Sequence, residues 1–207
     1  GRATGVSEED LGQRVAAVRQ ELEAAHEEAK RIEKKPTLRT LAPYWAPYKG
    51  GRYLPEYEVP TGVPAGEIAE LTRPLTSWPE GFHVHEKIKR LLEQRAEMGQ
   101  GKRPLDYGMA EALAFASLLA QDIPVRLTGQ DTRRGTFNQR HSVLIDVENG
   151  GEHMPLAQVA PEKAWIEIFD SFLSEQAVLG FEYGFSRDQP EALVLWEAQF
   201  GDFANGA

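Results

Sequence analysis

Two stretches of this sequence carry residue types that could do chemistry. The first is the polar run from Gly129 to His141, GQDTRRGTFNQRH, which follows a short apolar segment and is dense in hydrogen-bond donors. The second is Glu175, which follows the apolar run from Trp165 to Asp170 and stands where a new helix is expected to begin. In α/β folds, ligands bind beyond the carboxyl ends of parallel strands. Both stretches therefore predict ligand-binding positions.

Each stretch also has a purely structural interpretation. The polar run could equally be a turn that Asp131 and its neighbours hold together by local hydrogen bonds. Glu175 could be an acid that is favoured only by the dipole at a helix start. From the residues alone, both interpretations stay open.

Several other chemistries find no support in the sequence. There is no cysteine, so there is no thiolate nucleophile, disulfide or cysteine zinc site. No G-x-S-x-G elbow and no glycine-rich phosphate motif occurs either. His83 and His85 could share one face of a strand, but no third ligand lies near them in the sequence. We therefore expect these two histidines to be structural.

The composition restricts the partners and the compartment. The net charge is −9 and no basic stripe with interleaved aromatic residues is present, so we expect no nucleic-acid partner. No apolar run reaches 18 residues, so we expect no membrane partner. The absence of cysteine fits a reducing compartment, and a cytoplasmic location is expected.

The N-terminal part of the chain is expected to form two kinds of segment. Residues 1–35 predict a long amphipathic helix that is capped by Ser7, with apolar residues spaced four and three apart. His26, beside this apolar stripe, is expected on the surface. Residues 36–81 hold eight of the thirteen prolines together with several aromatic residues, and such density disfavours helices and central strands. This segment is expected to be an extended linker strap.

The remainder, residues 82–207, predicts an α/β domain. Helices are expected at 86–98 and 106–119, and the second of these is rich in small residues. Strands are expected at 123–129, 140–146, 165–170 and 192–196. Their nearly continuous apolar character favours a mostly parallel sheet flanked by helices.

Four motifs in this domain resemble those of a known family. They are DYGMAE at 106–111; LTGQD at 127–131 with RGTF at 134–137 and RH at 140–141; LSE at 173–175 with FEYG at 181–184; and LWEAQFGDF at 195–203. In this order and spacing they resemble the pyrimidine-binding domain of the decarboxylating component of 2-oxoglutarate dehydrogenase, a thiamine-diphosphate enzyme. Residues 1–81 resemble, more loosely, the stretch that joins the family's diphosphate-binding domain to this one.

The resemblance implies roles for four residues. Glu175 would hydrogen-bond a ring nitrogen of the cofactor's aminopyrimidine and so help the cofactor to lose its thiazolium proton, which requires a partly desolvated carboxylate. Leu173 would pack near the bend of the cofactor, and Phe203 would stack on the aminopyrimidine ring. Gln199 would be a polar contact to the cofactor.

The resemblance also implies partners and further parts. Arg140 and His141 would lie near the active site, without a sharper role. The family binds thiamine diphosphate with magnesium through a G-D-G…N motif that this sequence lacks, so magnesium would be held outside this chain. The family implies a homodimer with the active site between subunits, and a lipoyl-bearing dihydrolipoyl succinyltransferase as the partner. We therefore expect a fragment, truncated at its C-terminus, that is inactive alone.

Two other functions stay open at this point. The same chemistry could act on 2-oxoadipate or another 2-oxo acid, because most residues that would grip the distal carboxylate lie outside this chain. Alternatively, the chain could be a non-catalytic assembly domain in which Glu175 is only a helix-terminal acid.

Overall fold

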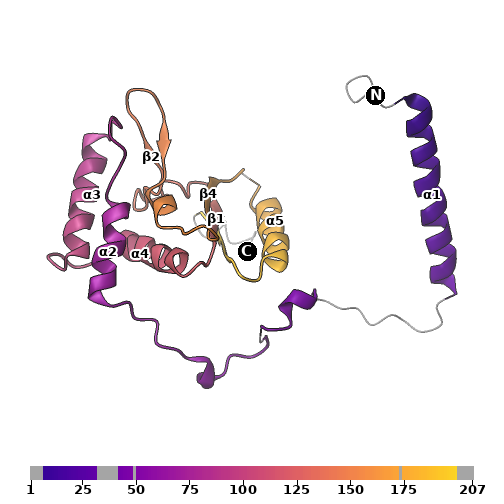
Figure 1. The fold of residues 1–207 in the computed structure, drawn as a ribbon, viewed down its shortest axis with the longest axis horizontal. Helices are drawn as coiled ribbons and strands as arrows, with labels where there is room; N and C mark the ends of the chain where they lie inside the picture. Colours follow the sequence, from indigo (N-terminus) through magenta and orange to yellow (C-terminus); the bar gives the residue numbers. More distant parts are fainter. Residues whose placement is uncertain (1–6, 32–41, 49, 173, 200–207) are drawn as a thin grey trace. The chain divides into compact units, whose positions relative to one another are not determined.

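The structure is a computed structural model, and it describes residues 7–31, 42–48, 50–172 and 174–199. The chain divides into two compact units, residues 1–41 and residues 42–207. The first unit contains α1 (Glu8–Lys30), drawn in indigo in Figure 1. Its cap is Ser7, whose side chain accepts a backbone N–H of the first turn at 3.0 Å. Every residue of α1 is exposed, His26 and the apolar stripe included.

The second unit begins with two short 3₁₀ turns, η1 (Pro43–Trp45) and η2 (Pro55–Tyr57). The first of them is fastened to the end of α5 (Glu175–Asp188). The Tyr44 hydroxyl donates to Asp188 Oδ1 at 2.6 Å, and Trp45 Nε1 donates to the backbone carbonyl of Arg187 at 2.6 Å. Two aromatic residues of this proline-rich segment, Tyr44 and Trp45, thus anchor it to the α/β domain.

Within the proline-rich segment, the prediction of an extended chain is wrong for α2 (Ala65–Leu75). Ile68, Leu71 and Leu75 recur at helical spacing and pack into the core. This burial favours the helix despite Pro74. Pro74 lies in the last turn, so its missing N–H and the steric clash of its ring disturb only the end of the helix. Tertiary packing has overridden the local preference of the sequence here.

Two further helices follow and match the predicted ones closely. They are α3 (Glu86–Gly99) and α4 (Tyr107–Ala120). His85 caps α3 by accepting a backbone N–H at 3.2 Å, and Asp106 caps α4 in the same way at 2.8 Å. Helix α2 packs on both α3 and α4, and α4 packs on the sheet. The small residues of α4 allow this close approach.

The main sheet has three parallel strands in the order β4-β1-β5. They are β1 (Val125–Gly129), β4 (Ile166–Asp170) and β5 (Leu193–Glu197). In the register, Gly129 is opposite Asp170 on one side and opposite Glu197 on the other. The three strands therefore end level with one another, and we call these three residues the carboxyl edge of the sheet.

Helices cover both faces of this sheet. Figure 1 shows β1 and β4 between α4 on one side and α5 on the other. Val125 and Leu127 point to the α4 side and are buried in the core, whereas Arg126 points to the α5 side and binds Glu182. Successive side chains of a strand alternate between its faces, so α4 and α5 lie on opposite faces. The predicted fold class, an α/β sheet that is mostly parallel and flanked by helices, is confirmed.

The strand predicted at 140–146 is the exception. Only β2 (Leu144–Ile145) is a strand, and it pairs antiparallel with β3 (Glu152–His153) outside the main sheet. His141 has a backbone φ of +49°, which a strand does not accommodate, and the Arg140 side chain is held by carboxylates rather than lying on a sheet face.

Asp146 holds the turn between β2 and β3. Its carboxylate accepts the His83 N–H at 3.0 Å and the Glu148 N–H at 2.8 Å, and His83 Nδ1 lies 3.4 Å away. The hydrogen bond from the His83 backbone, together with those from Glu148 and Asn149, lowers the pKa of Asp146 from its ordinary 3.8 to about 2.

This lowered pKa predicts a loss of stability in acid. A carboxyl whose pKa is depressed on folding stabilises the native state above its unfolded pKa, and this contribution is lost as the pH falls through the folded value. We expect the Asp146→Asn variant to be less stable than the wild type above pH 4. The difference in unfolding free energy, measured in urea, should shrink between about pH 4 and pH 2. A difference that does not depend on pH would contradict this assignment.

Candidate active site

The polar run after β1 connects the ends of the strands. We call residues 130–143 the β1 loop. Thr132, which is fully buried, donates its hydroxyl to the Phe169 carbonyl at 2.6 Å. The Arg133 N–H donates to Asp170 Oδ1 at 3.0 Å. The loop is thereby fixed to the end of β4, so it is more than a locally stabilised turn.

The same loop contacts the predicted catalytic carboxylate. Glu175 is the first residue of α5 and is partly buried. Gln130, the first residue of the β1 loop, donates its side-chain N–H to Glu175 Oε1. Because β1 and β4 end level, the first residue of the loop and the first residue of α5 meet at the carboxyl edge. Glu175 is therefore bound to the β1 loop instead of extending freely into solvent.

Gln199 meets the loop a few residues further along. Its side-chain N–H donates to the Thr136 hydroxyl at 3.4 Å, which is a long hydrogen bond. Of the four cofactor residues that the sequence predicts, Glu175 and Gln199 are thus brought to one loop. Leu173 and Phe203 lie outside the described residues, so their predicted roles stay predictions.

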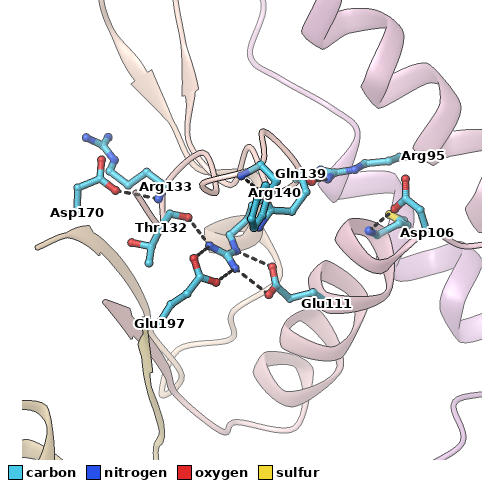
Figure 2. Close-up of polar contacts among 11 residues, drawn as sticks. Arg95, Asp106, Glu111, Thr132, Arg133, Gln139, Arg140, Asp170 and Glu197 are labelled. Carbon is cyan, nitrogen blue, oxygen red and sulfur yellow. Dashed lines mark hydrogen bonds and ion pairs between the residues drawn. The ribbon is translucent and has the colours of Figure 1, made fainter. Parts of the chain in front are cut away.

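Arg140 lies at the centre of this arrangement (Figure 2). Its side chain is 2% exposed and binds Glu111 of α4 and Glu197 at the end of β5. Burial by itself disfavours the cation, but the hydrogen bonds with Glu111 and Glu197 outweigh burial and raise the pKa of the guanidinium. Arg140 therefore stays charged and joins the loop to two other elements.

The far end of the loop rests on α3 and α4. Arg95, which is 4% exposed, donates to the Gln139 carbonyl at 2.8 Å. A side chain at Gly108 would place its Cβ 2.3 Å from this same carbonyl oxygen, so the helix start accepts only glycine there. Burial lowers the pKa of Arg95. These contacts fix the position of Gln139, near the end of the loop, relative to α3 and α4.

His141 differs from Arg140 in having an unused ring nitrogen. Its Nε2 is buried and receives no hydrogen bond from the described residues. Burial and the charges of Arg95 and Arg134 lower the pKa of His141. The ring is therefore neutral at neutral pH. The structure assigns it no contact with Glu175 or Gln199.

A partly buried arginine, Arg126, holds α5 on the sheet. Arg126 of β1 donates to Glu182 of α5 at 2.8 and 2.9 Å and to Glu167 of β4. Its guanidinium also lies over the rings of Phe169, Phe181 and Phe185, at 4.5 to 5.6 Å from their centroids. The Glu182 hydrogen bond is the main reason that the pKa of Arg126 is raised. This anchor fixes the helix that begins with Glu175.

An open cavity of about 490 Å³ lies between α5 and the sheet. Its lining residues include Ser174, the residue before Glu175, and Thr128, whose buried hydroxyl has no hydrogen-bond partner among the described residues. The other lining residues are mainly apolar and include Phe169, Phe172, Val178 and Phe181. Space for an aromatic ring therefore adjoins the first turn of α5.

Metal ligands and membrane spans are not found in the described parts of the chain. Across residues 7–31, 42–48, 50–172 and 174–199, no group of three or more His, Asp or Glu side chains is arranged to hold a metal ion. His83 instead lies beside Asp146, and His85 caps α3. None of the described helices is long and apolar enough to cross a membrane.

The sequence indicates few of the supporting residues. The polar run at 129–141 is recognisable as a candidate, but nothing in it singles out Gln130 or pairs Arg140 with Glu111 and Glu197. Arg126 was also missed, although a charged residue inside an apolar strand indicates a buried partner. The partners Glu111, Glu182 and Glu197 all lie inside the recognised motifs, which was the available signal.

Comparison with known proteins identifies the class. The sequence model described as the transketolase pyrimidine-binding domain matches residues 103–207. The chain therefore belongs to this family, which agrees with its parallel α/β sheet.

Individual relatives narrow the resemblance. The chain is 47% identical over 167 residues to the 2-oxoglutarate dehydrogenase E1 component of Cupriavidus necator, covering 79% of this chain and 17% of the relative. It is 51% identical over 147 residues to the E1 component of Brucella anthropi, covering 71% of this chain and 15% of the relative. The resemblance predicted from the four motifs is confirmed. The chain spans less than a fifth of the length of these relatives.

Proposed function

We propose that this chain is the pyrimidine-binding part of a thiamine-diphosphate-dependent 2-oxoglutarate dehydrogenase. The whole protein would decarboxylate 2-oxoglutarate and transfer the succinyl group to the lipoyl arm of a dihydrolipoyl succinyltransferase. The observation that carries this proposal is that Glu175 and Gln199 are both hydrogen-bonded to the β1 loop at the carboxyl edge. The names of the relatives support the substrate.

The donor set fits the pyrimidine half of this cofactor. A partly buried carboxylate can share a proton with a ring nitrogen, and Glu175 is such a group. The adjoining apolar cavity could accept an aromatic ring. When bound, thiamine diphosphate supplies the electron sink that lets a 2-oxo acid lose carbon dioxide.

The residues of this chain would bind and orient the cofactor. Glu175 would share the proton through one carboxylate oxygen, while Gln130 donates a hydrogen bond to the other oxygen, Oε1. The amide of Gln199 would contact the cofactor, Leu173 would pack at its bend, and Phe203 would stack on the pyrimidine ring. Arg126, through Glu182, would hold α5 in place on the sheet and would thereby fix the position of Glu175.

The remaining parts of the proposal concern the whole protein. We propose a homodimer in which the diphosphate and magnesium are held by another domain, so that this chain alone is inactive. The proposed organisation is a helix at 1–35, a linker at 36–81 that contains α2, and the pyrimidine-binding domain at 82–207. A cytoplasmic location is also proposed, on the absence of cysteine.

The test is an assay of the full-length parent protein with two substrates. Decarboxylation should require thiamine diphosphate and magnesium, and kcat/KM for 2-oxoglutarate should exceed that for 2-oxoadipate by at least about tenfold, the discrimination that a difference of one methylene can provide. Comparable values for the two acids would overturn the substrate and leave the reaction class. Full activity without the cofactor would overturn the class itself.

A further inference from the structure

Arg140 uses its whole hydrogen-bonding capacity inside the protein. A guanidinium has five N–H donors, and here all five are occupied. Two bond to Glu111 at 2.6 and 2.9 Å, two bond to Glu197, one of them at 3.0 Å, and one bonds to the Thr132 carbonyl at 2.9 Å. Figure 2 shows the three partners converging on the guanidinium from different directions. No donor is left for a ligand, so Arg140 does not bind one directly.

The partners of Arg140 belong to the segments that carry the cofactor residues. Glu197 is the last residue of β5 and lies two positions before Gln199. Thr132 lies two positions after Gln130, which contacts Glu175. One rigid, planar group thus joins the start of the β1 loop to the end of β5. Glu111 attaches the same group to α4.

Close packing also restrains the start of the β1 loop and the end of β5, in addition to the link through Arg140. A Cβ at Gly129 would lie 2.4 Å from the Glu197 carbonyl oxygen and 2.7 Å from Thr132 Cγ2. The loop, the end of β1 and the end of β5 are therefore in close contact at Gly129, and the same Thr132 and Glu197 bind the guanidinium. A change in the geometry of Arg140 is transmitted to both sides.

We propose that Arg140 is a positioning residue that sets the spacing between Glu175 and Gln199 around the cofactor's pyrimidine ring. It acts through Thr132 on the Gln130–Glu175 side and through Glu197 on the Gln199 side. This inference rests on the proposed function and adds to it a residue that touches neither cofactor nor substrate. The five-donor geometry is the essential property, and charge alone does not supply it.

The test compares two cofactors in the full-length parent protein. Dissociation constants are measured calorimetrically for thiamine diphosphate and for oxythiamine diphosphate, in which an oxygen replaces the amino group of the pyrimidine. Arg140→Lys keeps the charge but not the planar fork. We expect it to shrink the ratio of the two dissociation constants at least about fivefold, because the contacts that read the pyrimidine are no longer held at the right spacing. Glu197→Gln removes one side of the same link and should shrink the ratio in the same direction.

A matched control separates positioning from general stability. Leu92→Ala removes a buried side chain of α3 and should lower the melting temperature without changing the ratio. If Arg140→Lys and Glu197→Gln lower the melting temperature and leave the ratio unchanged, the proposal is overturned. Failure of both variants to fold would assign the cluster to stability alone and would also overturn it.

The outcome can be told apart from a failure of the proposed function. If the wild type binds neither cofactor and does not decarboxylate 2-oxo acids, the proposed function is wrong. If the wild type discriminates between the two cofactors and needs Glu175, while Arg140→Lys discriminates equally well, only the positioning role is wrong.

Discussion

Replacement of Glu175 by glutamine in the full-length parent is expected to reduce decarboxylation by at least about 100-fold, the lower end of the usual contribution of a positioned proton-transfer group. The amide keeps the shape of the side chain and can still accept from Gln130. It cannot share a proton with a ring nitrogen as a carboxylate does. Release of carbon dioxide from 2-oxoglutarate under saturating cofactor measures the effect, and assembly should be unaffected.

A matched control tests the alternative that Glu175 is only a helix-terminal acid. Glu86 is likewise the first residue of its helix, α3, and is exposed. Glu86→Gln removes the same charge from a helix start, which is worth about 0.3–1 kcal/mol in stability, and should leave turnover unchanged. If Glu175→Gln resembles Glu86→Gln, with undiminished decarboxylation, then Glu175 has no catalytic role and the non-catalytic alternative gains support.

The second large effect is expected on stability. Glu182→Gln should lower the free energy of unfolding by about 3–5 kcal/mol, since removing one partner of a buried ion pair leaves the other charge uncompensated. Glu182 is 4% exposed, and it accepts hydrogen bonds from both Nε and Nη2 of Arg126. The measurement is urea-induced unfolding at neutral pH.

Glu167 offers the matched control for this second prediction. It binds the same guanidinium, but its side chain is 40% exposed, and exposed ion pairs contribute about 0–1 kcal/mol. Glu167→Gln should therefore cost far less than Glu182→Gln. Equal costs for the two variants would show that burial does not decide the strength of this anchor. A double replacement of Arg126 and Glu182 by leucine should recover part of the loss, because no buried charge is left unpaired.

The two anchors have different consequences for the proposed site. Arg126 fixes the body of α5 on one face of the sheet, whereas Arg140 fixes the β1 loop and the end of β5. The carboxylate partners come from residues that are distant in sequence, such as Glu111 and Glu197. The two arginines therefore fix α5, the β1 loop and the end of β5 relative to the sheet.

The family and the mostly parallel sheet could be predicted from the sequence, and so could the candidate position of Glu175 after a strand. Nearly continuous apolar runs such as Leu193–Trp196 favour a parallel sheet that is covered on both faces. The motif around Glu175 lies directly after another such run, Trp165–Asp170. These are local properties of the chain, so they can be read from neighbouring residues.

The contacts that hold the candidate site together follow from the folded chain and could not be predicted from the sequence. The pairing of Arg140 with Glu111 and Glu197 joins residues 29 and 57 positions apart, and no spacing rule predicts it. The helix at 65–75 likewise forms because its apolar face has a core to pack on, despite Pro74. The strand predicted at 140–146 is mostly loop because Arg140 is drawn to two carboxylates. Burial and charge pairing act between distant segments, and they become visible only when the chain is folded.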